Sequence, residues 1–406
     1  MDLTTLMTVA GLFLSIVVGN AAIFGESLFA SISVPKAVET SGLDRATAER
    51  LFAAQVAWYA RLPSILPTPS VSTSSAPSVA MALAKPIQLG DLVYSVQTQL
   101  RTDVVSANGA IMEAAGSKAL SMLMVISNPP NPPVTLKLHQ ADGDAQALLQ
   151  RTARETMIEI APYRVALSDL ATLLDGATDG VAKARQTATR GLEQPWDPSP
   201  TGATEIVLLH NLLAVLAIEG GDAQTAREHF TLAHTTPGAV STAYCLVHMN
   251  EAFLSLTERN PKEADAFFKK GMSTLGFDFR ESLRGRLQVL EALIAWQAGD
   301  VSRAEKLLRD AAGGADTEIE PHYYLAKIFQ DRGDAARAEA ERRAAHIAVR
   351  FDQHYASLAH TILGIDVATG KLDVTAFLPD LSAKIAAQRA ADAAVLPAPA
   401  QSAPAR

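Results

Sequence analysis

The chain has 406 residues and a net charge of -8, with 48% hydrophobic and 19% charged residues. This composition supports a sizeable core and excludes a largely disordered protein, and the acidic balance argues against a non-specific nucleic-acid binder. The one cysteine, Cys245, excludes an intramolecular disulfide and any multi-cysteine metal site, and we expect it to be a buried structural thiol.

The N-terminal segment predicts a membrane anchor. Leu6–Phe24 is a run of nineteen residues without a charge, and a helix of that length, rising about 1.5 Å per residue, roughly spans a hydrocarbon layer of ~30 Å. No Lys or Arg precedes the run, whereas a cleavable signal peptide usually begins with basic residues. We expect residues 1–29 to be an uncleaved anchor; the alternatives are a signal peptide and a buried helix.

Residues 30–163 predict a small α/β domain. The expected elements, in chain order, are a strand at 30–35, a helix at 41–61, a loop at 63–79, a strand at 78–83, a helix at 89–100, a hairpin of strands at 104–113 and 118–127, a strand at 134–139 and a helix at 144–160. Asp144 is the expected N-cap of the last helix.

This order of elements, with Gly109 in the first hairpin strand and Gly116 in the turn, resembles the TolB amino-terminal-domain-like fold over residues 30–163. The resemblance implies a module that lies just outside a membrane helix and precedes repeats, as in bacterial cyclase-like signalling proteins. The sequence departs from the family pattern at His139-Gln140, where an aromatic residue is usual.

A pattern of small residues recurs beyond residue 200. In each copy a Gly-Asp or Arg-Asn pair lies between two alanines that are twelve positions apart. Glycine can adopt the left-handed C-cap of one helix, Asp or Asn can cap the next helix, and the alanines let the two helices approach closely. The copies are Ala214, Gly221-Asp222 and Ala226; Ala252, Arg259-Asn260 and Ala264; Ala292, Gly299-Asp300 and Ala304; and Ala326, Gly333-Asp334 and Ala338.

These copies resemble tetratricopeptide repeats, whose ideal period is about 34 residues; the spacings here are 38, 40 and 34. The resemblance implies an α-dominated protein in which a helical solenoid at 164–375 follows the transmembrane helix and the small α/β domain. The solenoid would begin with an irregular helix pair at 167–192. Helices at 354–365 and 381–394 would close it, the second within a closing segment at 376–394, ahead of a disordered Pro/Ala-rich tail at 395–406. The alternative is an unrelated alanine-rich helical bundle.

The sequence shows no motif for catalysis. It lacks a phosphate-binding glycine loop, the H-E-x-x-H zinc motif and the G-x-S-x-G nucleophile motif, so we expect a non-enzymatic protein with no cofactor, no catalytic residue and no metal site. The nine histidines are expected to be surface or packing residues. Glu155 and Glu159 share a helix face, and we expect both to be solvated.

The repeat resemblance implies a concave groove, lined by the first helix of each hairpin, that holds an extended peptide or a partner helix. The residues that match its lining are Asn211, Val215, Met249, Phe253, Val289, Leu293, Trp296, Tyr323, Lys327 and Gln330. The large apolar side chains in the middle of this set predict a hydrophobic binding strip; the alternative is that the protein's own C-terminal helices cover it. At the positions of the clamp that holds acidic chaperone tails, only Asn250 and Arg286 match, so chaperone-tail binding is not expected.

Two functions follow from the sequence. The first is a membrane-anchored scaffold or assembly factor, a single-pass protein of the bacterial inner membrane whose soluble part lies in the periplasm and binds a protein or peptide. The alternative is the sensory or regulatory half of a bacterial signalling system whose effector is on another chain. Neither binds nucleic acid, and the oligomeric state is left open.

Overall fold

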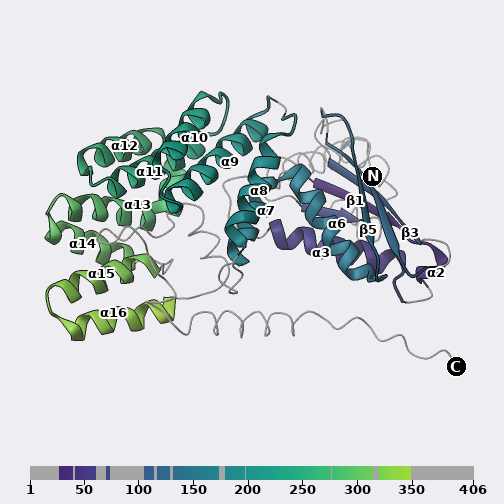
Figure 1. Ribbon diagram of the computed structural model, residues 1–406. Helices are drawn as coiled ribbons and strands as arrows, with labels where there is room; N and C mark the ends of the chain where they lie inside the picture. The colour runs from purple at the N-terminus through teal and green to yellow at the C-terminus, as the bar shows by residue number, and fades with distance from the viewer. Residues whose placement is uncertain are drawn as a thin grey trace, which may run out of the picture. The chain divides into compact units, whose positions relative to one another are not determined.

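A computed structural model of the chain describes residues 27–39, 42–60, 70–73, 105–113, 117–128, 131–172, 179–196, 198–275, 277–313 and 319–348. The described chain is mostly helical and contains one small mixed sheet (Figure 1). It divides into two compact units, residues 1–165 with 190–198 and residues 166–189 with 199–406. The expected anchor at Leu6–Phe24, strand at 78–83, helix at 89–100, and closing helices and tail beyond residue 350 lie outside the described residues.

The sheet of the first unit contains five strands in the order β2-β1-β3-β4-β5. Strand β1 pairs in parallel with β2 and β3, whereas β3–β4 and β4–β5 are antiparallel, which confirms the predicted hairpin. The prediction of a loop at 63–79 is wrong at β2, a short edge strand within that range. The strands are β1 (Ser27–Ser33), β2 (Ser70–Thr73), β3 (Val105–Glu113), β4 (Leu120–Ser127) and β5 (Val134–Gln140).

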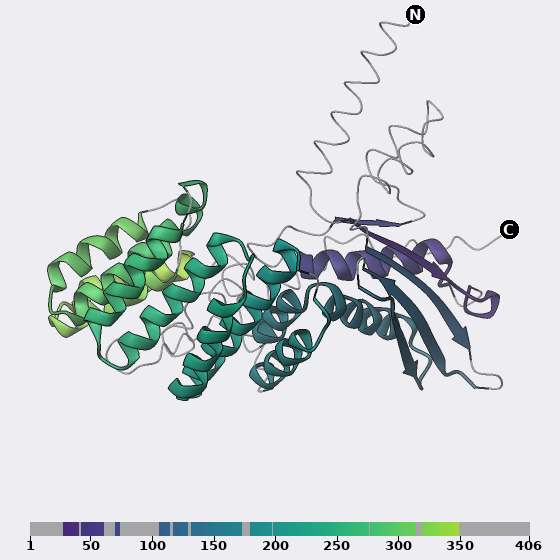
Figure 2. The same cartoon turned by 90° about the horizontal axis from the view of Figure 1, so that it is seen from above.

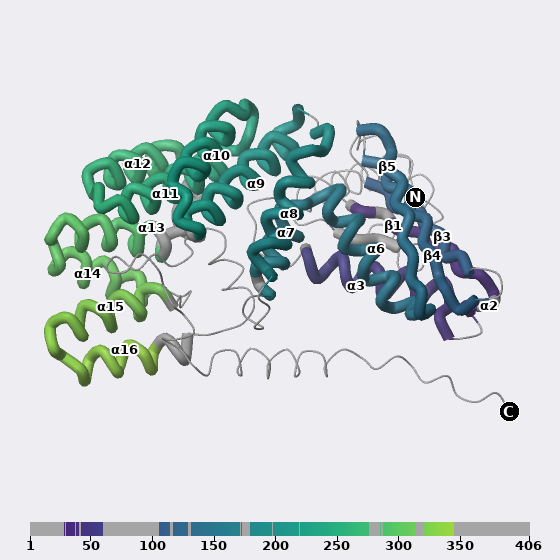
Figure 3. Tube along the Cα trace, viewed as in Figure 1, coloured from purple at the N-terminus to yellow at the C-terminus, as the bar shows by residue number. Residues whose placement is uncertain are grey.

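One face of this sheet forms the core of the first unit. The helices α3 (Arg45–Ala60) and α6 (Ala145–Ile160) contact each other and neighbouring strands, so both cover the same face (Figure 3). The alternate residues of β4, from Leu120 to Ile126, are buried, as expected for a strand with one face in the core. Asp144 caps α6 as predicted, its side chain accepting a hydrogen bond from the backbone N–H of Ala147 at 2.9 Å. A short helix, α2 (Lys36–Glu39), precedes α3.

The second unit is built from helices. Within the described residues of this unit, α9 to α16 form four consecutive hairpins, and each hairpin contacts the next (Figures 1 and 2). The predicted irregular pair at 167–192 is observed as α7 and α8, with α7 starting earlier, at Pro162. The helices are α7 (Pro162–Ala171), α8 (Gly180–Leu192), α9 (Pro200–Glu219), α10 (Ala223–Thr235), α11 (Ser241–Thr257), α12 (Pro261–Thr274), α13 (Phe277–Gln297), α14 (Val301–Ala312), α15 (Ile319–Asp331) and α16 (Ala335–Ala348).

The four hairpins share one turn geometry. In each turn one residue has a positive φ angle: 77° at Gly221, 58° at Arg259, 93° at Gly299 and 75° at Gly333. In each turn the next residue donates its backbone N–H to a carbonyl five positions earlier, at 2.8–2.9 Å, the pattern of a Schellman C-cap. That same residue is the N-cap of the following helix: Asp222, Asn260, Asp300 and Asp334 each accept a backbone N–H three residues on. The predicted role of the Gly-Asp pairs is therefore confirmed.

The alanines of the repeated pattern lie between the paired helices. All eight are buried, with exposed fractions between 0% and 2%. A side chain as small as alanine at these points allows the helix backbones to approach closely, as predicted. The eight residues are Ala214, Ala226, Ala252, Ala264, Ala292, Ala304, Ala326 and Ala338.

One described segment is long and apolar enough to cross a membrane. Pro200–Ile218 in α9 has a mean hydropathy of 1.7, and 78% of the segment is buried within the protein. Core helices of soluble proteins have the same properties, so this segment is weak evidence for a membrane span.

Candidate functional site

The predicted binding strip lies on the first helices of the hairpins, α9, α11, α13 and α15, but most of it is packed inside. Of its residues, Trp296 and Lys327 are half-buried and Gln330 is exposed. The large apolar residues of the strip already pack against the protein itself. Their burial therefore argues against direct contact with a partner. The buried members are Asn211, Val215, Met249, Phe253, Val289, Leu293 and Tyr323.

Two asparagines link the first two of these helices inside the unit. The side-chain amide of Asn250 on α11 donates a hydrogen bond to Oδ1 of Asn211 on α9 at 2.9 Å, and both residues are 1% exposed. This bond joins α9 to α11 through buried polar atoms. The two residues match positions that the repeat resemblance assigned to ligand contact, yet each is engaged by the other.

The carboxylates of Glu155 and Glu159 on α6 are not simply solvated, contrary to expectation. Nη1 of Arg190 lies 2.5 Å from Oε2 of Glu155, and Nη2 lies 2.5 Å from Oε1 of Glu159. Burial lowers the pKa of Arg190, but its hydrogen bonds and charge interactions with the two carboxylates outweigh burial and raise it. Arg190 lies in the last turn of α8, a turn that belongs to the first unit together with α6. Its guanidinium joins this turn to α6, which explains the pair of carboxylates as a structural clamp.

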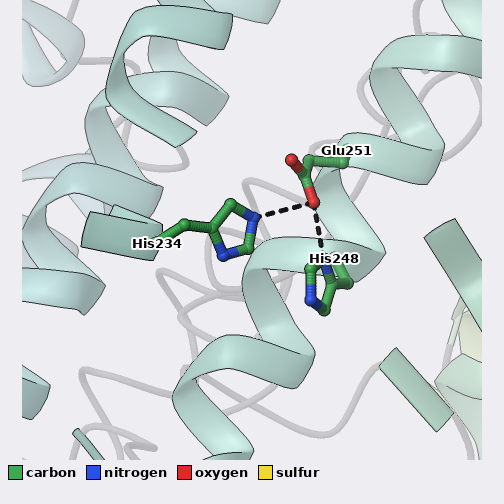
Figure 4. Close-up of side chains that lie close together, drawn as sticks. All are labelled: His234, His248 and Glu251. Carbon is green, nitrogen blue, oxygen red and sulfur yellow. Dashed lines mark hydrogen bonds and ion pairs between the residues drawn. The ribbon is translucent and has the colours of Figure 1, made fainter. Parts of the chain in front are cut away.

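Among the described residues, one group of three potential metal ligands lies close together: His234, His248 and Glu251. Oε2 of Glu251 lies 2.6 Å from Nδ1 of His248 and 3.0 Å from Nε2 of His234 (Figure 4). His248 and Glu251 stand at i and i+3 on α11, so they share a helix face, and His234 comes from the last turn of α10. The two imidazole rings stack with their centroids 4.5 Å apart.

The two histidines keep the carboxylate of Glu251 ionised. Burial raises the pKa of Glu251, but hydrogen bonds from His234 and His248 outweigh burial and lower it, so the carboxylate is ionised at neutral pH. An ionised carboxylate only accepts hydrogen bonds. Both histidines must therefore donate, through Nδ1–H of His248 and Nε2–H of His234. The side chain of His248 is 4% exposed and that of His234 is 28% exposed.

Helix α12 approaches the cluster closely because it carries a glycine there. A Cβ atom on Gly271 would lie 3.2 Å from Cβ of His248 and 3.4 Å from the carbonyl oxygen of Cys245. On the same helix the ring of Phe267 stacks on His248 with the centroids 6.4 Å apart. The imidazole of His248 is therefore held between α10 and α12, and Cys245 is buried, as predicted.

A cleft of about 230 Å³ opens beside the cluster. Glu251 lies in its wall, and the cleft also contains the carboxylates of Glu258 and Glu263 and the guanidinium of Arg227, which forms an ion pair with Glu258. Acidic groups thus predominate in the cleft, which favours cations over anions. The lining comes from α10, the end of α11 and α12: Arg227, Phe230, Thr231, Glu251, Leu254, Ser255, Glu258, Glu263 and Phe267.

The sequence prediction missed this cluster. The expectation of no metal site treated the nine histidines one by one, as surface or packing residues. The local signal was His248-x-x-Glu251, a spacing that brings two ligands onto one helix face. His234 lies fourteen residues before His248, and only the pairing of α10 with α11 brings it to the same point. No protein-family model and no curated protein matches this chain.

Proposed function

We propose that this protein is a non-enzymatic scaffold whose tetratricopeptide-like helical solenoid holds a protein or peptide partner. The observation that carries the proposal is the fourfold repetition of one turn, in which a left-handed C-cap residue is followed at once by the N-cap of the next helix. Equal turns and buried alanines give each hairpin a similar shape. Similar hairpins that contact their neighbours in chain order are typical of repeat arrays, which present extended binding surfaces.

The binding face that we propose contains the accessible members of the predicted strip. Trp296 on α13 is half-buried, with its ring edge-on to Tyr324 of α15 at a centroid distance of 6.4 Å. Lys327 and Gln330 on α15 add a half-buried cation and an exposed amide. Tryptophan is among the residues most enriched at binding hot spots, because it contributes a large contact area with little loss of side-chain freedom.

We further propose that Leu6–Phe24 anchors the protein in the bacterial inner membrane, with the helical unit in the periplasm. The support is the uncharged run of nineteen residues in the sequence. A carbonate wash of membranes tests the anchor, since release of the protein into the soluble fraction would contradict it. Protease treatment of spheroplasts that carry a C-terminal tag tests the side of the membrane: a protected tag would contradict the periplasmic placement.

The binding face is tested by recovering partners from cross-linked cells with the full chain and with Trp296→Ala. Truncating a hot-spot tryptophan typically costs at least about 2 kcal/mol, near thirtyfold in affinity, so we expect the specific partner to be lost while the melting temperature stays close to that of the wild type. Trp58→Ala is the matched control, because Trp58 is 38% exposed and lies on α3 of the first unit.

Three results are distinguished. Loss of the partner with Trp296→Ala but not with Trp58→Ala supports the scaffold. Unchanged recovery together with a clear fall in melting temperature shows that Trp296 serves internal packing, and rejects this binding face. Specific recovery of a signalling enzyme as the partner would favour the sensory alternative over the scaffold.

A further inference from the structure

Three donor atoms of the types that transition metals prefer converge between α10 and α11. One ring nitrogen of His234, one ring nitrogen of His248 and one carboxylate oxygen of Glu251 all lie within 4.8 Å of one another. Figure 4 shows one carboxylate oxygen of Glu251 joined to both imidazoles, which come from different helices. Helix geometry and helix packing bring the three side chains together. His248 and Glu251 share a face of α11, and the packing of α10 against α11 places His234 beside them.

We propose that His234, His248 and Glu251 bind one divalent transition-metal ion of the zinc class. Imidazole and carboxylate are preferred ligands of zinc, and two histidines with one glutamate form a known three-ligand set that leaves a fourth position for water or another ligand. The proposal is independent of the scaffold function, because it concerns an ion held within a single hairpin junction.

The observed distances fit this proposal. Zinc–nitrogen and zinc–oxygen bonds of about 2.0–2.2 Å with tetrahedral angles place neighbouring donor atoms about 3.3–3.6 Å apart. The donor atoms of His248 and His234 lie 2.6 Å and 3.0 Å from that of Glu251. Each must therefore move outward by less than about 1 Å, which is within reach of small side-chain rotations.

The hydrogen bonds to Glu251 must be exchanged for bonds to the metal. Nδ1 of His248 and Nε2 of His234 carry protons that point at the carboxylate, and a metal requires the lone pair of each nitrogen. On binding, each proton moves to the other nitrogen of its ring or, from a doubly protonated ring, to solvent. Glu251 loses two hydrogen bonds and gains a bond to the cation, so its negative charge stays compensated.

The cleft beside Glu251 provides an approach for the ion. Glu251 is part of its lining, and Glu258 and Glu263 add negative charge to its wall. The guanidinium of Arg227 is paired with Glu258 rather than with Glu251, so no cation of the cleft lining competes for the proposed ligand. The side chain of His234 is more exposed than those of His248 and Glu251.

The test uses the full-length chain without a polyhistidine tag, treated with a chelator and then dialysed. Zn²⁺ is titrated against the protein in the presence of a chromophoric competitor, and Co²⁺ is added separately for its absorption spectrum. We expect one Zn²⁺ per chain and a Co²⁺ spectrum typical of a four-coordinate nitrogen and oxygen site. Glu251→Gln and His234→Gln should each weaken Zn²⁺ binding at least about 100-fold, since loss of even a supporting residue typically costs 10–100-fold.

His322→Gln is the matched control. His322 also pairs with a glutamate, Glu341, at 2.8 Å, but that pair belongs to no three-ligand group within the described residues, so this variant should bind Zn²⁺ like the wild type. The proposal is overturned if the wild type binds no Zn²⁺, or if Glu251→Gln and His234→Gln bind it as tightly as the wild type does. Because His234 is partly exposed, His234→Gln keeps the test decisive if Glu251→Gln fails to fold.

Discussion

The Nδ1 atoms of His210 on α9 and His229 on α10 lie 3.1 Å apart, with the ring centroids 5.3 Å apart. One nitrogen must donate a proton and the other must accept it, so the contact excludes a state in which both rings are doubly protonated. Burial and the charge of His229 lower the pKa of His210 to about 4. Burial and the charge of Arg185 also lower the pKa of His229, and the charge of Glu228 partly opposes them.

This pair predicts that the helical unit loses stability in mild acid. An unfolded histidine titrates near pH 6.5, whereas His210 in the folded protein titrates at about 4. Between these values the unfolded state binds more protons, so the free energy of unfolding falls as the pH falls from about 6.5 to 4. After discounting for partial exposure, we expect the pair to account for a loss of about 1–2 kcal/mol, measured by urea unfolding at several pH values.

The control for this prediction is His210→Asn, which removes the titrating ring and keeps a polar side chain. The variant should unfold more easily at pH 7, because the contact with His229 is lost, but its stability should change less between pH 6.5 and pH 4. If the wild type and His210→Asn show parallel pH profiles, the acid sensitivity comes from other groups and the role assigned to the pair is wrong.

The second turn of the array contains a residue that is poorly suited to its conformation. Arg259 has a φ angle of 58°, where the equivalent residue of the other three turns is glycine. A left-handed conformation costs a non-glycine residue about 1–2 kcal/mol, which glycine avoids. Glycine also increases the conformational entropy of the unfolded chain, and this offsets part of the stabilisation. We expect Arg259→Gly to raise the free energy of unfolding by up to about 1 kcal/mol in chemical denaturation.

The reverse change tests the same turn geometry. Gly299 has a φ angle of 93°, and a Cβ atom there would meet no atom within 4 Å. The cost of Gly299→Ala is therefore conformational, about 1–2 kcal/mol. If Arg259→Gly lowered the stability, or Gly299→Ala left it unchanged, the two turns would not share the conformation described here.

The turns and the missed cluster show what the sequence could and could not predict. Gly299 and Asp300 act through contacts within six residues, so their spacing was sufficient to predict both the turn and the cap. Apolar Val134, Leu136 and Leu138 alternate with polar residues, and this period of two was enough to predict a strand at β5. By contrast, β2 has the sequence Ser-Val-Ser-Thr, which carries little apolar signal and is a strand only because β1 pairs with it.

The binding strip and the histidine cluster depend on tertiary packing. The repeat pattern predicted that Met249 and Phe253 share a helix face, but it could not show what covers that face, and both side chains are 1% exposed. His234 and His248 become neighbours only after two helices pack. Residue spacing along the chain therefore predicts neither the burial of the strip nor the proximity of His234 to His248. A pattern within a single helix shows only that His248 and Glu251 share a face.

Ala304 tests the close packing of the third hairpin. Its side chain is fully buried between α13 and α14, and Ala304→Leu would place three more heavy atoms there. Overpacking of this kind typically costs about 1–3 kcal/mol, which should appear as a lower melting temperature. Ala336→Leu makes the same change at an exposed position of α16 and should have little effect. Equal melting temperatures for the two variants would contradict the packing of Ala304 between the helices.

Gly143, in the turn from β5 to α6, tests the first unit independently of the helical array. Its φ angle is 76°, and a Cβ atom would lie 2.4 Å from the carbonyl oxygen of Lys118. That oxygen belongs to the backbone beside β4, so it cannot rotate away as a side chain could. Gly143→Ala therefore combines conformational strain of about 1–2 kcal/mol with a steric clash, and we expect a loss of more than about 2 kcal/mol.

Gly42 provides the matched control for this prediction. Its φ angle is 97°, but a Cβ atom there would meet nothing within 4 Å, so Gly42→Ala carries the conformational cost of about 1–2 kcal/mol without the clash. Both changes affect the same unit, and the difference between their free energies of unfolding isolates the steric cost at Lys118. Hydrogen exchange of the amides in β3 and β4 would report it, because faster exchange follows a lower local stability. If both variants exchange at the same rate, the turn at Gly143 can move away from Lys118, and the close approach of β5 and α6 to this backbone is not required for the fold.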